Sequence, residues 1–246
     1  VQQLGLPPIV TKLCEAPKGL ILVTGPTGSG KSTTLAAMVD HINKTRKAHI
    51  LTLEDPVEFV HHSQKSLVNQ REIGVHSQSF GRAWKAALRE DPDIVLVGEM
   101  RDLETVSLAL ETANTGHLVF GTLHTSTAVS TIDRIIDLFP VEQQGQVRTA
   151  LSDSLRAVVA QSLCRKKSGG RIAAIEVLVS NYAIANLIRE GKTAQLYSQI
   201  QTGGEQGMQT LEKALADLVN NGDVTQAEAM AKASKPGELQ RLIGDV

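Results

Sequence analysis

A glycine-rich segment near the start of the chain has the residue types and spacing needed to bind phosphate. It fits the pattern G-x-x-x-x-G-K-[ST] with Gly25, Pro26, Thr27, Gly28, Ser29, Gly30, Lys31 and Ser32. The glycines let backbone N–H groups converge on phosphate oxygens, and a following helix adds the positive end of its dipole. Lys31 would reach the β- and γ-phosphates, and the Ser32 hydroxyl would bind Mg²⁺. We predict that this segment, together with Thr33, binds MgATP.

Two acidic segments could supply the groups that hydrolysis needs in addition to a phosphate loop. Glu99 follows the apolar run Ile94–Val97, and open α/β sheets place their ligands at such strand ends. We expect Glu99 to polarise the attacking water; the alternative is a carboxylate that stabilises a helix N-terminus. Gly98 stands where many P-loop ATPases carry a Mg²⁺-linked Asp, so the metal contact is either indirect or supplied from elsewhere.

The second acidic segment, Glu54-Asp55-Pro56-Val57-Glu58, follows another apolar run. Three acids in five residues would be costly to bury without a cation, and a MgATP site supplies one. We expect Glu54 to position water or metal; the alternative is a solvated acidic turn before the proline.

Basic side chains could complete such a site. His124 ends the segment after Gly116 and could contact the γ-phosphate, whereas we interpret His117 as structural. An arginine from a neighbouring subunit could stabilise the transition state. We favour Arg134 and Arg89 among five candidates, the others being Arg71, Arg82 and Arg101.

These residues lie between apolar runs and helical patterns that must position them. Four short runs, typical of parallel strands covered on both faces, are Gly19–Thr24, His49–Leu53, Ile94–Val97 and Leu118–Thr122. Helices are expected over Ser32–His41, Asp102–Asn114 and Thr127–Leu138. The alternation predicts an α/β fold with a mainly parallel sheet wrapped by helices.

The last third of the chain has a different pattern. Arg171–Val179 is a possible strand, and helices are expected over Asn181–Glu190, Met208–Val219 and Gln226–Ala233. Thr225 and Glu228 are spaced as a capping box for the last of these, with Val224 as its hydrophobic staple. We therefore predict an ATPase core over residues 1–180 and a small helical subdomain over residues 181–246.

The composition of the chain narrows the class of protein to which it can belong. The chain has 246 residues, 41% of them hydrophobic, and a net charge of −1, so it lacks the global basic footprint of duplex-DNA binding and no nucleic acid is expected. Cys14 and Cys164 cannot form a disulfide framework, and no apolar run reaches the roughly 20 residues of a membrane span. The two cysteines favour a reduced, cytosolic compartment. The start, Val1-Gln2-Gln3-Leu4, is neither an initiator Met nor a signal peptide, which suggests a fragment with a segment lost upstream.

Four segments together resemble a known family. GPTGSGKSTT at 25–34, LTLEDPVEFVH at 51–61, REDPDIVLVGEMRD at 89–102 and GHLVFGTLHTSTA at 116–128 resemble the Walker A, Asp box, Walker B and His box of the type II/type IV secretion ATPases. Within that superfamily the sequence is most similar to the retraction ATPases of type IV pili, a similarity that extends through Ala183–Gly207.

This resemblance implies a RecA-like ATPase core and a homohexameric ring motor that drives pilus retraction in twitching motility. It implies a location at the cytoplasmic face of the inner membrane, peripheral to it, with an inner-membrane platform protein as partner. It further implies roles in phosphate and Mg²⁺ binding for Lys31 and Ser32, catalysis for Glu99, and supporting roles for Glu54 and His124.

Three departures and three alternatives accompany the resemblance. Family members carry an N-terminal PAS-like domain that this chain does not contain; Ala185 replaces an Arg of the A-[IV]-R-N-L-I-R-E segment, and Trp84-Lys85 replaces Leu-Arg. The alternatives are a pilus extension or type II secretion ATPase, a nucleic-acid translocase or type IV secretion motor, and a nucleotide-binding subunit without turnover. An extension or secretion ATPase usually carries a four-cysteine zinc insert, whereas only Cys164 follows the His box here.

Overall fold

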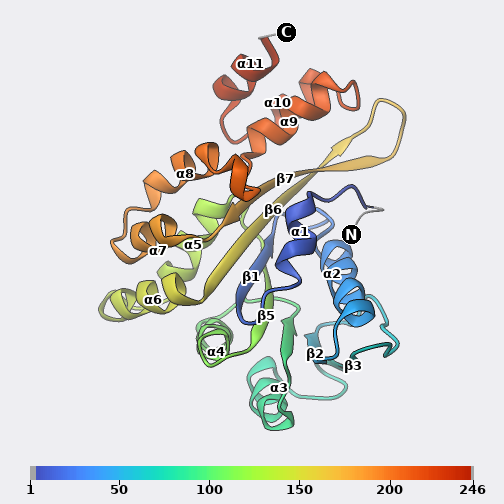
Figure 1. Ribbon diagram of the computed structural model, residues 1–246, viewed down its shortest axis with the longest axis vertical. Helices are drawn as coiled ribbons and strands as arrows, with labels where there is room; N and C mark the ends of the chain where they lie inside the picture. Colours follow the sequence, from blue (N-terminus) through green and yellow to red (C-terminus); the bar gives the residue numbers. More distant parts are fainter. Residues whose placement is uncertain (1–3, 245–246) are drawn as a thin grey trace.

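A seven-stranded sheet organises the chain in the computed structural model, which describes residues 4–244, so that residues 1–3 and 245–246 lie outside the described part (Figure 1). The order is β3-β2-β4-β5-β1-β6-β7; all neighbours are parallel except β6 and β7. The strands are β1 (Gly19–Thr24), β2 (His49–Glu54), β3 (Leu67–Glu72), β4 (Ile94–Val97), β5 (Leu118–Leu123), β6 (Leu155–Arg165) and β7 (Arg171–Val179).

Helices cover both faces of this sheet. They are α1 (Pro8–Leu13), α2 (Lys31–Thr45), α3 (Phe80–Ala87), α4 (Leu103–Asn114), α5 (Ala128–Asp137), α6 (Val141–Ser154), α7 (Tyr182–Arg189), α8 (Leu196–Thr202), α9 (Leu211–Asn220), α10 (Gln226–Lys232) and α11 (Pro236–Gly244). The predicted α/β class with a mainly parallel sheet is confirmed.

The central strands are buried on both faces because their side chains alternate between two cores. In β1, Leu20 and Leu22 pack into a core with residues of α3 to α8, whereas Ile21 and Val23 pack with α1 and α2. All six residues of β1 and all six of β5 are buried. These continuous apolar runs therefore form strands that are covered on both faces of the sheet.

The C-terminal helices form a third, smaller core on the far ends of the β6–β7 hairpin (Figure 1). Leu215 and Val224 are fully buried there with Cys164 of β6 and Ala174 of β7. The β6–β7 hairpin thus contributes residues to this small core as well as to the two cores of the sheet. The predicted domain boundary at residue 180 stays a prediction.

Several elements differ from the sequence-based expectation. Strands β3 and β6 and helices α1, α3, α6, α8 and α11 were not expected. The helix after the phosphate loop extends to Thr45, and the helix expected from Met208 begins at Leu211 behind its N-cap Thr210. None of the described helices is both long and apolar enough to span a membrane.

The capping box predicted at α10 is wrong in one of its two bonds. Thr225 Oγ1 accepts the N–H of Glu228, as predicted, at 3.2 Å. The Glu228 carboxylate instead accepts the N–H of Arg165 at 3.0 Å, because β6 ends beside the helix and offers a main-chain donor. Glu228 therefore joins α10 to β6.

Candidate functional site

The phosphate-loop segment connects the end of β1 to the start of α2 and requires glycine for steric reasons. Gly25, Gly28 and Gly30 have φ values of 144°, 76° and 89°, a region that favours glycine. A Cβ at Gly25 would lie 2.3 Å from the carbonyl oxygen of Gln161. The loop therefore packs tightly against β6 while its other side faces a pocket.

Lys31 begins α2 and turns its side chain back over the loop. Its Nζ donates to the carbonyl oxygens of Gly25 at 2.8 Å and Pro26 at 3.2 Å, and lies 3.5 Å from His124 Nδ1. Burial lowers the pKa of Lys31, and the charges of Glu99 and Glu58 oppose that shift. A phosphate group could replace these carbonyl oxygens as the partner of the ammonium.

Glu99 lies just beyond the end of β4, between two cationic or ionisable side chains. Its carboxylate oxygens lie 2.5 Å from an Arg101 guanidinium nitrogen and 2.9 Å from His124 Nε2. The hydrogen bond from Arg101 is the main reason that the pKa of Glu99 is lowered, and burial opposes that shift. Glu99 is therefore an ionised carboxylate that can accept a hydrogen bond from water.

His124 bridges the loop lysine and the carboxylate from the end of β5. An imidazole with its proton on Nε2 donates to Glu99 and leaves Nδ1 to accept from Lys31, which satisfies both contacts. The structure thus brings together Lys31, Glu99 and His124, which are 93 residues apart at their extremes.

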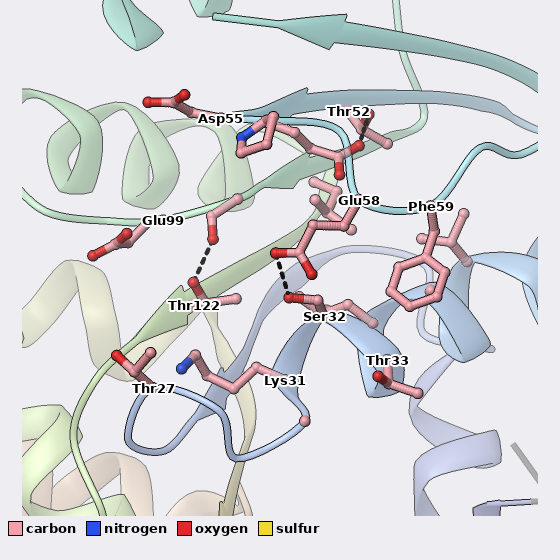
Figure 2. Close-up of a pocket in the computed structure, with 18 of the residues that line it drawn as sticks. Thr27, Lys31, Ser32, Thr33, Thr52, Asp55, Glu58, Phe59, Glu99 and Thr122 are labelled. Carbon is pink, nitrogen blue, oxygen red and sulfur yellow. Dashed lines mark hydrogen bonds between the residues drawn. The ribbon is translucent and has the colours of Figure 1, made fainter.

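In the acidic segment after β2, the carboxylates of Glu54 and Glu58 have different kinds of hydrogen-bond partner. Glu54 accepts bonds from Thr52 Oγ1 at 2.6 Å and Gln70 Nε2 at 3.1 Å, so it is fixed against the sheet. Glu58 accepts the hydroxyl of Ser32 at 3.0 Å, and Figure 2 shows this bond crossing the pocket. Glu58, which the sequence analysis did not select, is therefore the acid that contacts the predicted Mg²⁺ ligand.

A pocket of about 470 Å³ joins these groups, a size suited to a small-molecule ligand. Its lining includes Thr27, Gly28, Gly30, Lys31, Ser32, Thr33, Glu54, Glu58, Glu99, Arg101 and His124. Thr122 also lines this pocket, and its hydroxyl donates to the carbonyl oxygen of Gly98 (Figure 2). The loop residues Pro26 and Ser29 line a neighbouring hollow of about 270 Å³ together with Thr27 and Gly28.

The two favoured arginines lie elsewhere. Arg89 is exposed in the short turn after α3, Arg134 is exposed on α5, and neither lines the pocket. Arg101, ranked lower in the sequence analysis, lies in the pocket and pairs with Glu99. Its position two residues after Glu99 was the available signal. Within one chain, therefore, Arg101 is the arginine that contacts the predicted catalytic carboxylate.

Comparison with known proteins places the chain among secretion and pilus ATPases. Residues 6–231 match the family model described as type II/IV secretion system protein. The chain is 57% identical to the type IV pilus retraction ATPase PilT of Pseudomonas aeruginosa over 236 residues, covering 96% of this chain and 69% of that protein. It is 55% identical to the twitching motility protein of Neisseria gonorrhoeae, covering 95% of this chain and 63% of that protein.

A solved structure agrees with these sequence matches. The crystal structure of the pilus retraction motor PilT with bound ADP matches with a TM-score of 0.93 and 55% identity, over 98% of this chain and 68% of that one. The chain spans about two thirds of the length of these relatives.

Proposed function

The chain belongs to the type II/IV secretion system protein family, and on that premise we propose that it is the ATP-hydrolysing part of a motor for type IV pilus retraction. The observation that carries the proposal is the convergence of Lys31, Glu99 and His124 in one pocket at the strand ends. The related retraction motor whose structure matches was solved with ADP, which supports a nucleotide as the ligand.

Phosphate binding would begin with Lys31. Its ammonium would exchange the carbonyl oxygens of Gly25 and Pro26 for the β- and γ-phosphates, and backbone N–H groups at the start of α2 would donate to the same anion. The lowered pKa of Lys31 reflects desolvation, which an incoming phosphate would counter.

The residues around Ser32 suit Mg²⁺, because this ion prefers oxygen ligands and one or two carboxylates. The hydroxyl of Ser32 and the carboxylate of Glu58 lie 3.0 Å apart and face the pocket. Ser32 would bind the ion directly, and Glu58 would hold it or its water; Glu54 would act indirectly through Gln70 and Thr52. The ion would neutralise charge on the phosphates.

Glu99 would orient the water that attacks the γ-phosphate. Its carboxylate is ionised and held from both sides by Arg101 and His124, so it can accept a hydrogen bond from water in a fixed direction. His124 would respond to binding of the γ-phosphate, because its Nδ1 faces the Lys31 ammonium, which the phosphate would draw away.

A ring of subunits would complete the machine. We propose a homohexamer at the cytoplasmic face of the inner membrane, acting through a platform protein of the pilus. Arg89 and Arg134 are both exposed, so each could reach the nucleotide of a neighbouring subunit.

The test is nucleotide binding by Lys31→Ala, measured by titration with a fluorescent ATP analogue in Mg²⁺. Loss of charge-assisted bonds worth about 3 kcal/mol should raise the Kd about 100-fold. Lys44→Ala is the matched control, because Lys44 lies on the same helix but pairs with Asp40 at the surface. An unchanged Kd for Lys31→Ala would contradict the proposed loop function.

A further inference from the structure

Gln161 on β6 is a buried polar side chain that contacts the phosphate loop from behind, away from the pocket. It is 2% exposed, and its amide Nε2 donates to the carbonyl oxygen of Ser29 at 2.6 Å. Its Oε1 accepts the hydroxyl of Thr34, itself 3% exposed, at 2.9 Å. One side chain thus bridges the loop and the first turn of α2.

The same residue also bounds the loop sterically. A Cβ at Gly25 would lie 2.3 Å from the Gln161 carbonyl oxygen, and a Cβ at Gly30 would lie 3.1 Å from its Nε2. Gln161 therefore contacts the loop at its start, through its main chain, and near its end, through its side chain. These contacts with β6 constrain the main-chain conformation of the loop between Gly25 and Gly30.

An uncharged amide is the chemical group that these contacts require. The contact with Ser29 needs a donor and the contact with Thr34 needs an acceptor, and a primary amide supplies both from one terminus. A carboxylate would place two acceptors there and repel the Ser29 carbonyl oxygen. An aliphatic side chain would leave the buried Ser29 carbonyl without this donor.

We propose that Gln161 is a positioning residue for nucleotide binding, acting through the phosphate loop without touching the nucleotide. It would fix the Ser29 peptide and the start of α2 so that the N–H groups on the opposite side of the loop point into the pocket. Because phosphate binding depends on the direction of several N–H groups at once, small rotations of the loop weaken all of them together. The inference rests on the proposed function as an ATPase.

Gln209 supplies a matched control. It is a partly buried glutamine whose Nε2 donates to the carbonyl oxygen of Ile175 at 2.7 Å, with no contact to the loop. Gln209→Met and Gln161→Met each remove one amide bond to a main-chain carbonyl, and Gln161→Met also removes the acceptor of Thr34, a loss that Thr34→Val measures by itself. A difference between them in nucleotide affinity therefore reports on position and not on the general loss of a hydrogen bond.

The experiment measures the Kd for fluorescent MgATP and MgADP analogues, with urea unfolding of each variant in parallel. Gln161→Met should raise both Kd values about 10-fold, and Gln161→Glu should raise them further, because it keeps the acceptor for Thr34 but repels Ser29. Thr34→Val should raise them only about 3-fold, since the Ser29 bond is kept. Gln209→Met should leave both Kd values unchanged.

The outcomes separate this inference from the function on which it rests. Parent-like affinity in a folded Gln161→Met variant would overturn the positioning role while leaving the ATPase proposal intact. Should Gln161→Met fail to fold, Gln161→Glu and Thr34→Val decide, and parent-like affinity in both would overturn it equally. Absence of nucleotide binding by the parent chain would overturn both proposals.

Discussion

Glu99 and Glu176 are carboxylates in the same sheet-based fold, yet their surroundings shift their pKa values in opposite directions. Glu99 lies at the pocket, where the hydrogen bond from Arg101 lowers its pKa. Glu176 lies in β7, is 2% exposed, and has its pKa raised by burial. The first carboxylate pairs with the side chains of Arg101 and His124, whereas the second, among the described residues, accepts main-chain N–H groups with both oxygens.

The partners of Glu176 show what a buried carboxylate does here. One oxygen accepts the N–H of Ala128 at the start of α5 at 2.7 Å, and the other accepts the N–H of Leu211 at the start of α9 at 3.3 Å. Helix N-termini favour a negative charge. Glu176 therefore joins the helix that follows His124 to the C-terminal helices, and its role is to connect elements.

Glu212 is a second buried carboxylate and, with Glu176, forms what we call the buried acid pair. It is fully buried and accepts the N–H of Lys235 at 2.8 Å and the hydroxyl of Tyr197 at 3.1 Å. The Lys235 ammonium lies 3.1 Å from the centroid of the Tyr197 ring, and its positive charge opposes the rise in the pKa of Glu176. The comparison teaches that acids at the open strand ends suit chemistry, and acids enclosed by N–H groups suit assembly of the fold.

The largest expected effect is a loss of ATPase activity on substitution of Glu99, the carboxylate at the pocket. Glu99→Gln should reduce kcat for ATP hydrolysis by at least about 100-fold, because an amide cannot take up a proton or hold water as a carboxylate does. Nucleotide affinity should change little. The control is Glu104→Gln, an exposed acid paired with Lys85. Equal turnover in Glu99→Gln and the parent would remove the distinction between the two carboxylates.

The second prediction concerns stability in place of activity. Glu176→Ala should lower the free energy of unfolding by about 3 kcal/mol, because two buried N–H groups lose their acceptor. Glu176→Gln keeps one acceptor oxygen and should lose less. Urea unfolding of both variants, with exposed Glu205→Ala as control, measures this loss. A change below about 0.5 kcal/mol in Glu176→Ala would contradict the connecting role.

A third prediction sharpens the pKa contrast. Arg101→Ala removes the main cause of the lowered pKa of Glu99, so that pKa should rise. Because Glu99 must be ionised to act, the acidic limb of the kcat profile should move to higher pH. Arg241→Ala, at an exposed position on α11, should leave the limb in place. An unmoved limb in Arg101→Ala would show that another group sets the pH dependence.

The smallest effect is expected at Tyr197, whose hydroxyl contacts Glu212 and, at 2.7 Å, Glu238. Tyr197→Phe should cost about 1 kcal/mol of stability, the typical net value of a hydrogen bond. Tyr182→Phe serves as control, because Tyr182 is 87% exposed. Thermal unfolding would measure the difference. A stability equal to that of the parent would show that the Tyr197 hydroxyl does not contribute to the stability of the buried acid pair.

Local patterns were sufficient to predict the parts of the fold that carry periodic or motif signals. The apolar runs that became β1, β4 and β5 are buried on both faces, which is the arrangement such runs indicate. The strand β7 has the predicted bounds, and α4 and α5 begin at side-chain N-caps, Asp102 and Thr127. Each of these signals lies within a few adjacent residues.

The longest strand shows where local patterns failed. β6 begins at Leu155 directly after α6 ends at Ser154, with no turn residue between them. Polar Gln161 and Ser162 interrupt its apolar pattern, and the buried side chain of Gln161 finds its partners, Ser29 and Thr34, far away in sequence. Its place in the sheet is decided by tertiary contacts.

The candidate site divides in the same way. The phosphate loop, Glu99 and His124 carried positional signals in the sequence, and the structure places them in or beside one pocket. The bond from Ser32 to Glu58 spans 26 residues, and nothing local distinguishes Glu58 from Glu54 as its acceptor. The choice depends on how the segment after β2 turns over the pocket.

The proposed ring motor is tested most directly by the rate of ATP hydrolysis per chain as a function of protein concentration, with mass measured on the same samples. Sites completed by a neighbouring subunit predict that the rate per chain rises in step with the hexamer fraction, and that Glu99→Gln abolishes the rise. A constant rate per chain while the hexamer fraction changes, or loss of activity on assembly, would contradict the account.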